Sequence, residues 1–132
     1  MRRQSRYSTV IALIVIAALA APVFAAKWVK LGERTVTDRM DIDKIKVGVD
    51  EGAFSRIQLS ASGGPVRVRR INVVFENGGE QSFDRNYIVA RGGRGPVHKL
   101  QGAERHIKRV ELFYDEASRK RQRTEIRVWA RR

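Results

Sequence analysis

The chain has 132 residues, with 27 Lys and Arg against 14 Asp and Glu, which gives a formal net charge of +13 at pH 7. This length suits one domain rather than several. The sequence contains no cysteine, which excludes disulfides, cysteine-ligated zinc and a lipid anchor attached to cysteine.

The N-terminal segment has the three parts of a secretory signal peptide. Three arginines within the first six residues precede an uncharged apolar stretch over residues 9–21, and Pro22 and small residues follow. We therefore predict a signal peptide helix over residues 1–25, Sec-type export and cleavage after Ala25, or one residue later. The alternative is an uncleaved anchor, since residues 10–26 approach the length of a bilayer span. After cleavage we expect no transmembrane span and a periplasmic or secreted protein.

Residues 26–132 predict a single β-domain, because apolar side chains recur at every second position in segment after segment. Three such segments occupy the first half, and a turn with the sequence SGGP ends them. Their predicted core-facing positions are Val29 and Leu31, then Ile45, Val47 and Val49, then Ile57, Leu59 and Ala61.

The next segment, residues 66–75, changes its apolar parity from Val66 and Val68 to odd positions beginning at Ile71. Such a slip predicts a β-bulge at the pair Arg69-Arg70. The following turn contains Asn-Gly, which tolerates the positive φ of tight hairpins. The return strand, over residues 81–90, places three more side chains in phase: Phe83, Tyr87 and Val89.

Residues 91–96, RGGRGP, predict a loop too flexible to belong to a strand. A short element over residues 97–102 follows, and then two further alternating strands. Their predicted inward positions are Val110, Leu112 and Tyr114, then Ile126, Val128 and Ala130. About eight strands of this length predict an all-β fold, a single antiparallel β-sandwich. A partly open β-barrel is the alternative.

Positive charge is concentrated near the C-terminus, where residues 85–132 hold 14 basic and 5 acidic residues. The last strand predicts a sheet edge whose outward charges discourage pairing with other chains, and residues 118–123 predict the hairpin tip before it. Solvation alone explains much of this basic run. We also predict that the same residues form an anion-contact surface, because Arg beside an exposed Trp combines stacking with phosphate contact. The candidates are Arg119, Lys120, Arg121, Arg123, Arg127, Trp129 and Arg131.

Other chemistry has weak support in the sequence. His98 and His106 lack the close-spaced partners of a zinc site, so we expect surface or rim histidines and no metal. The acidic run around residues 38–51 does not match a calcium loop and predicts a solvated face. No nucleophile elbow is present, and we expect no catalytic residue and no cofactor. At least one of Trp28 and Trp129 is expected to be buried.

Export determines which anions the protein meets. We expect an anionic lipid, lipopolysaccharide, an acidic glycan or an acidic protein as partner, and not nucleic acid. The first function hypothesis is a non-enzymatic binding or accessory domain. The alternative is a small envelope hydrolase acting on a glycan, because sequence spacing does not reveal which carboxylates meet in space.

Four stretches of the chain carry a resemblance to a known family: WVKLGERTV, FSRIQLSASGGPVRVRRINVVFENG, GAERHIKRVELFYD and IRVWA. Together they extend over most of residues 28–130. They resemble a group of short exported proteobacterial proteins classified as a domain of unknown function. The resemblance implies a periplasmic or secreted β-protein, and it supplies no catalytic residues.

Overall fold

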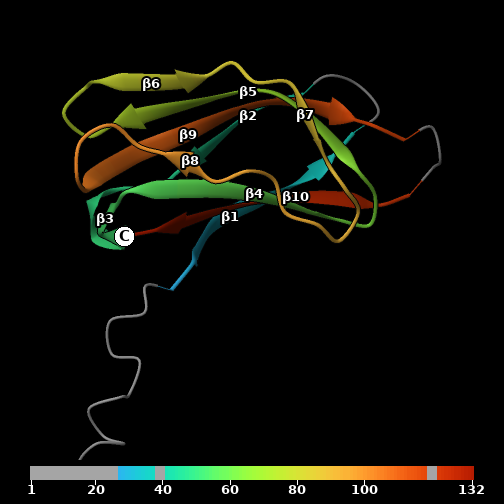
Figure 1. Cartoon of the computed structure of the whole chain (residues 1–132), viewed down its shortest axis with the longest axis horizontal. Helices are drawn as coiled ribbons and strands as arrows, with labels where there is room; N and C mark the ends of the chain where they lie inside the picture. The colour runs from blue at the N-terminus through green and yellow to red at the C-terminus, as the bar shows by residue number, and fades with distance from the viewer. Residues whose placement is uncertain (1–26, 38–40, 119–121) are drawn as a thin grey trace, which may run out of the picture.

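The computed structural model describes residues 27–37, 41–118 and 122–132. Within these ranges ten strands form two antiparallel sheets that pack face to face (Figure 1). The predicted all-β sandwich is confirmed, and the described strands do not close into a barrel. The predicted signal peptide lies outside the described residues. In the part of the chain that is described, no helix is long and apolar enough to cross a bilayer.

The four-stranded sheet, which we call sheet A, has the strand order β1, β10, β4, β8. Its members are β1 (Val29–Val36), β10 (Thr124–Arg131), β4 (Arg56–Ser62) and β8 (His98–Lys99). The prediction of a C-terminal edge strand is wrong, because β10 pairs with β1 on one side and with β4 on the other. The first strand of the domain takes the edge position instead.

The second sheet, sheet B, has the order β2, β9, β5, β6, with two further short strands paired to β9 and β5. Its members are β2 (Asp41–Lys46), β9 (Arg105–Glu116), β5 (Val66–Phe75), β6 (Glu80–Phe83), β3 (Ala53–Phe54) and β7 (Tyr87–Val89). The predicted bulge is confirmed, since the β5–β9 register shifts between Val68 and Arg70. The predicted return strand is two separate strands: β6 pairs with the second half of β5, and β7 pairs with the first half.

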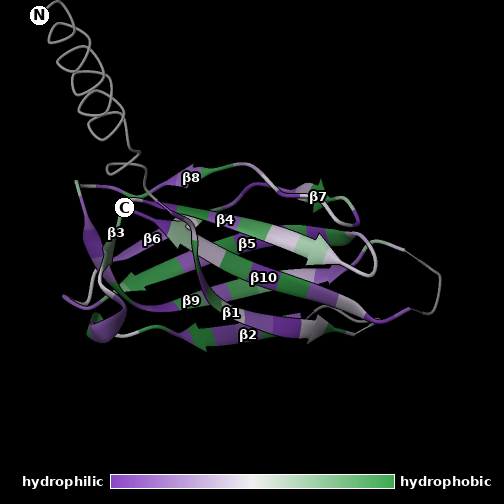
Figure 2. Cartoon of the chain, turned by 90° about the horizontal axis from the view of Figure 1, so that it is seen from below, coloured by the Kyte–Doolittle hydropathy of each residue, from purple (hydrophilic) through white to green (hydrophobic). Residues whose placement is uncertain are grey.

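The core lies between the sheets and consists of the alternating side chains predicted from the sequence. Figure 2 shows the alternation of hydrophilic and hydrophobic residues along β10. Fully covered side chains include Ile57, Leu59, Val66, Val68, Ile71, Val73, Val110, Leu112, Tyr114, Ile126, Val128 and Ala130. Burial of such apolar surface is the main favourable term that holds a sandwich without cross-links together.

Two predicted core positions are wrong. Val49 is 56% exposed because β2 ends at Lys46 and the chain turns into a short 3-10 helix, η1 (Val49–Glu51). Gly48, with φ of +90°, permits that turn. Val29 is 39% exposed, because it is the first residue of β1, which lies at the edge of sheet A.

The connections also differ from the predictions. Residues 91–96 lie outside any strand, as predicted, but the backbone of this loop is fixed to the edge of β4. Gly92 N–H donates to Ala61 O at 2.9 Å, and Gly95 N–H donates to Leu59 O at 2.8 Å. The connection between β9 and β10 is not a hairpin, because these two strands belong to different sheets, and residues 119–121 of the predicted hairpin tip lie outside the described residues. The predicted Asn-Gly hairpin between β5 and β6 is confirmed.

Candidate anion-binding face of sheet A

The outer face of sheet A carries the outward side chains of the last strand. Along β10, Ile126, Val128 and Ala130 are fully covered, whereas Arg127 and Trp129 are only half-buried. The predicted alternation of this strand is therefore confirmed. The face is wide, because β1 and β4 place their own polar side chains on either side of β10.

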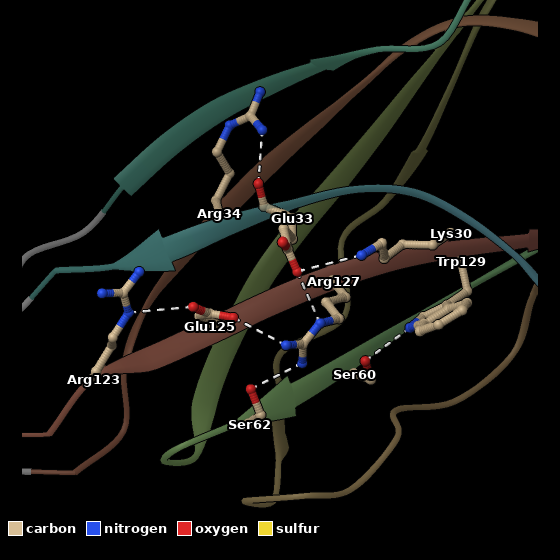
Figure 3. Close-up of polar contacts among 9 residues, drawn as sticks. All are labelled: Lys30, Glu33, Arg34, Ser60, Ser62, Arg123, Glu125, Arg127 and Trp129. Atoms are coloured by element: carbon tan, nitrogen blue, oxygen red, sulfur yellow. Dashed lines mark hydrogen bonds and ion pairs between the residues drawn. The ribbon is translucent and has the colours of Figure 1, made fainter.

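One half of this face is electrically balanced (Figure 3). Arg127 donates from Nε to Glu33 Oε2 at 2.9 Å and from Nη2 to Glu125 Oε2 at 3.0 Å. Its remaining terminal nitrogen, Nη1, donates to Ser62 Oγ at 2.9 Å. The Lys30 ammonium adds a further contact with Glu33 at 3.7 Å. Arg127 is thus committed to holding three strands together and has little capacity left for a ligand.

The basic run before β10 divides into two parts. Arg119, Lys120 and Arg121 lie outside the described residues. Arg123 is highly exposed, and its Nε lies 3.3 Å from Glu125 Oε1. An ion pair in such an exposed position is weak and screened by salt, so Arg123 contributes charge rather than a built site.

The other half of the face holds three cations side by side. Arg56 of β4 lies directly opposite Arg131 of β10 on one side and opposite Lys99 of β8 on the other. We call Lys99, Arg56 and Arg131 the cationic row. Neighbouring strands are about 4.8 Å apart, so the three side chains leave the sheet at that interval. Among the described residues, no carboxylate forms an ion pair with any of them.

Two tryptophans flank the cationic row, each with an arginine over its ring. The guanidinium carbon of Arg131 lies 4.9 Å from the Trp28 ring centroid, and that of Arg94 lies 5.6 Å from the Trp129 centroid. Trp129 is also fixed by its indole N–H, which donates to Ser60 Oγ at 2.8 Å. Both tryptophans are half-buried, so the expectation that at least one is buried is wrong. Each instead presents part of its ring beside a cation.

Arg94 lies beside Trp129 because the loop that follows β7 is held against β4. Arg94 forms a β-bridge with Ser60, and the backbone bonds of the same loop hold it against β4. An Arg from a segment that sequence reasoning treated as mobile is thereby brought beside Trp129. Stacking of guanidinium on indole leaves the N–H edges of the arginine available to an anion.

The electrostatics of the row favour an anionic ligand. Like charges directly opposite each other in a sheet are destabilising, and here one arginine has a like-charged neighbour on both sides. The sheet could have relieved this by placing carboxylates nearby, as it does around Arg127. The uncompensated row is therefore the part of the face where a bound phosphate, sulfate or carboxylate would be stabilised most.

Sequence reasoning found only part of this arrangement. Of the seven candidates, the structure brings Trp129 and Arg131 into the arrangement and commits Arg127 to ion pairs within the fold. The sequence analysis missed Arg56, Lys99 and Arg94. Arg56 was visible as the outward residue of an alternating strand, but only the register of β8, β4 and β10 shows that three cations meet.

The histidines and acidic residues serve other purposes. His98 is buried, at 3% exposure, so the prediction of a rim position is wrong for it. Its Nε2 lies 2.9 Å from the Tyr87 hydroxyl oxygen, and its ring lies against Phe83. Burial, and secondarily the positive charge of Arg85, lowers the pKa of His98 below its ordinary value. His106 is exposed.

The predicted acidic face is held by local contacts. Asp41 accepts hydrogen bonds from the backbone N–H and hydroxyl of Thr37, and Asp43 accepts one from the Tyr114 hydroxyl. That bond and burial both contribute to a raised pKa of Tyr114, with burial the larger cause. Asp38 lies outside the described residues. Within the described ranges, no group of three histidine or acidic side chains is arranged to hold a metal ion.

Comparison with known proteins gives one assignment. No curated protein matches the sequence significantly. The family model described as "Domain of unknown function (DUF2541)" matches residues 9–130, which include every strand of both sheets except the last residue of β10. The match thus extends over nearly the whole sandwich and includes Lys99 and Arg56 of the cationic row but not Arg131, and the chain belongs to the DUF2541 family of domains of unknown function.

Proposed function

We propose that this protein is an exported, non-enzymatic binding or accessory domain whose cationic row contacts an anionic envelope component or partner protein. The observation that carries the proposal is the row itself: Lys99, Arg56 and Arg131 lie in register on three adjacent strands without a carboxylate partner among the described residues. The flanking tryptophans supply flat apolar surface next to the charges, which suits a ligand that is partly apolar and partly anionic.

The ligand class follows from the geometry of the face. An open sheet surface with charges about 4.8 Å apart suits groups repeated along a surface or polymer better than a single small molecule, which needs a concave pocket. Anionic lipid, lipopolysaccharide, acidic glycan and acidic protein all meet that description. Their shared chemistry is a series of phosphate, sulfate or carboxylate groups.

Charge-matched variants test the proposal. One variant replaces Lys99, Arg56 and Arg131 with Gln, and its control replaces Arg119, Lys120 and Arg121 with Gln, so that both lose three positive charges. Binding to vesicles containing phosphatidylglycerol and to a soluble acidic glycan is then measured at low and high salt. We expect the first variant to lose about tenfold or more in affinity, since three contacts of about 0.5 kcal/mol each multiply.

The control variant should lose clearly less, and wild-type binding should weaken as salt shortens the screening length from about 8 Å to about 3 Å. Equal losses in the two variants would mean that net charge alone drives binding and that the row is not a site. Binding that ignores salt would overturn the electrostatic basis of the proposal altogether.

The proposed location rests on the leader and has its own test. Expression from the full-length sequence, followed by fractionation of the cell and mass measurement of the protein, should give a periplasmic or secreted chain that begins at Ala26. A chain that retains residues 1–25 in the membrane fraction would replace cleavage with anchoring, and an intact chain in the cytosol would reject export.

A glycan hydrolase is the second candidate, and one feature favours it. A hollow of about 210 Å³ is lined by Glu76, Glu104 and His106, which brings two carboxylates and an imidazole to one place. If these carboxylates perform the chemistry of a hydrolase, Glu76→Gln and Glu104→Gln should each abolish release of reducing ends from envelope glycans. Wild-type protein without any such activity would dismiss this alternative.

A further inference from the structure

A second cavity, of about 440 Å³, opens where the end of β2, the start of β9 and the β5–β6 turn come together. Figure 1 shows the β5–β6 turn and the beginning of β9 at the same end of the sandwich. The lining residues are Lys46, Val47, Gly48, Glu76, Lys108 and Arg109. A volume of this size falls within the range of small-molecule sites.

The register of the sheet explains why cations gather on one wall. Lys46 of β2 is paired with Arg109 of β9, so their side chains leave the same face. The β5–β9 register shifts between Val74 and Phe75, which leaves Lys108 as an extra residue without a partner on β5. Lys108 and Arg109 therefore both turn outward between two buried neighbours. Bulges often re-aim a side chain in this way beside functional sites.

The charges that line the cavity are poorly compensated. Arg109 is held by Glu111, with Nε 2.8 Å from Oε2. Among the described residues, the side chains of Lys46, Lys108 and Glu76 form no ion pair, although they line one cavity. Opposite charges that face a common space without meeting leave room for a molecule between them.

We propose that this cavity binds a small zwitterion that carries a phosphate at one end and an ammonium group at the other. The phosphate lies against Lys46 and Lys108, with Arg109 beside them, and the ammonium faces the Glu76 carboxylate. Because Glu111 neutralises Arg109, the remaining charges of Lys46, Lys108 and Glu76 leave a formal excess of one positive charge at the cavity. A phosphate of about −1.5 to −2 together with one ammonium carries about −0.5 to −1 and complements that excess. Val47 offers apolar contact to the short chain between the two groups.

This chemistry has two sources, the headgroup of a phospholipid and a free phosphorylated amine. Phosphoethanolamine represents the free phosphate monoester, and glycerophosphoethanolamine represents the lipid headgroup with its phosphodiester. Ethyl phosphate is the matched probe that keeps the phosphate and the two-carbon chain but lacks the ammonium. The inference does not depend on the cationic row, because it concerns a different face and different residues.

The test is titration of the isotope-labelled protein, expressed from its full-length sequence, with each probe while the backbone amide signals are followed by NMR. We expect the largest shifts at the amides of Val47, Gly48 and Lys108. Phosphoethanolamine should bind about threefold or more tightly than ethyl phosphate, as expected for one exposed ion pair. Tighter binding of glycerophosphoethanolamine would identify a lipid headgroup, and tighter binding of the monoester a free ligand.

Two variants make the assignment decisive. Glu76→Gln should equalise the affinities for phosphoethanolamine and ethyl phosphate, whereas Lys108→Gln should weaken both about threefold or more. Arg91→Gln, which removes one exposed positive charge from the loop after β7, is the control and should change neither. Equal binding of the two probes to wild-type protein, or the absence of shifts at Val47, Gly48 and Lys108, would overturn the proposal and leave the function of sheet A unaffected.

Discussion

Replacing Arg56 with Gln should make the protein more stable while it weakens anion binding. Arg56 lies between Lys99 and Arg131 in the cationic row. Two unit charges at about 6 Å in water repel by about 0.7 kcal/mol, so two neighbours give about 1.4 kcal/mol before screening. The change also removes the hydrogen bond from Arg56 Nη1 to Ser55 Oγ, at 3.0 Å, which offsets part of the gain.

We therefore expect a net gain of about 0.5 kcal/mol at low ionic strength, which corresponds to about 2–4 °C in Tm for a domain of this size. The assay is thermal unfolding followed by circular dichroism at about 10 mM and 1 M salt. At the higher salt the screening length falls to about 3 Å, and the gain should disappear.

Arg127→Gln is the matched control, because it removes the same charge from the same face. Arg127 holds Glu33 and Glu125, so its loss should lower stability by about 1 kcal/mol or more. The reasoning fails if Arg56→Gln is less stable than wild type at low salt. It fails equally if the gain at low salt persists undiminished at 1 M.

Three further predictions concern the turn after β4, the buried His98 and the half-buried Trp129. Gly63→Ala should lower the free energy of unfolding by about 2 kcal/mol or more in urea titrations, because Gly63 has φ of +82° and an added Cβ would collide with the carbonyl oxygen of Arg123; an unchanged midpoint would contradict this. The pKa of His98 is lowered by burial in the folded protein, so the unfolded chain binds the proton more readily. The stability that neutral, buried His98 confers is complete above the pKa of about 6.5 that histidine has in the unfolded chain, and it is lost as the pH falls below that value. His98→Gln should therefore make Tm less dependent on pH when Tm is measured from pH 8 to 5. An equal slope of Tm against pH in both proteins would mean that other groups cause the pH dependence. Trp129→Phe should reduce the change in tryptophan fluorescence when anionic vesicles are added, and an undiminished signal would place the contact away from this ring.

Much of the fold followed from local pattern. Alternation at Ile57, Leu59 and Ala61 identified a strand with one buried face, because side chains of a strand point to opposite sides at each step. The parity change across residues 66–75 identified the bulge for the same reason. Where the strand ends early, as it does before Gly48 and Val49, the sequence pattern predicted a strand that is too long. The alternation of apolar residues continues in the sequence after the backbone has turned.

Strand order was beyond the reach of local pattern. The sequence presents β10 as a terminal strand, and terminal strands are often edges, but β1 returns from the other end of the domain and covers it. The division of residues 81–90 into β6 and β7 likewise depends on where β5 bulges against β9. Such pairings join residues far apart in the chain, and no short window contains them.

By itself the sequence determined a β-domain without cross-links, an apolar stretch near the N-terminus and an excess of basic residues near the C-terminus. Only the tertiary structure decided which of those charges are compensated. Arg127 and Arg131 are four residues apart on the same face of one strand, yet one meets carboxylates and the other meets arginine and tryptophan. The physical reason is that charges interact through space over a few ångströms, and the register between strands sets those distances.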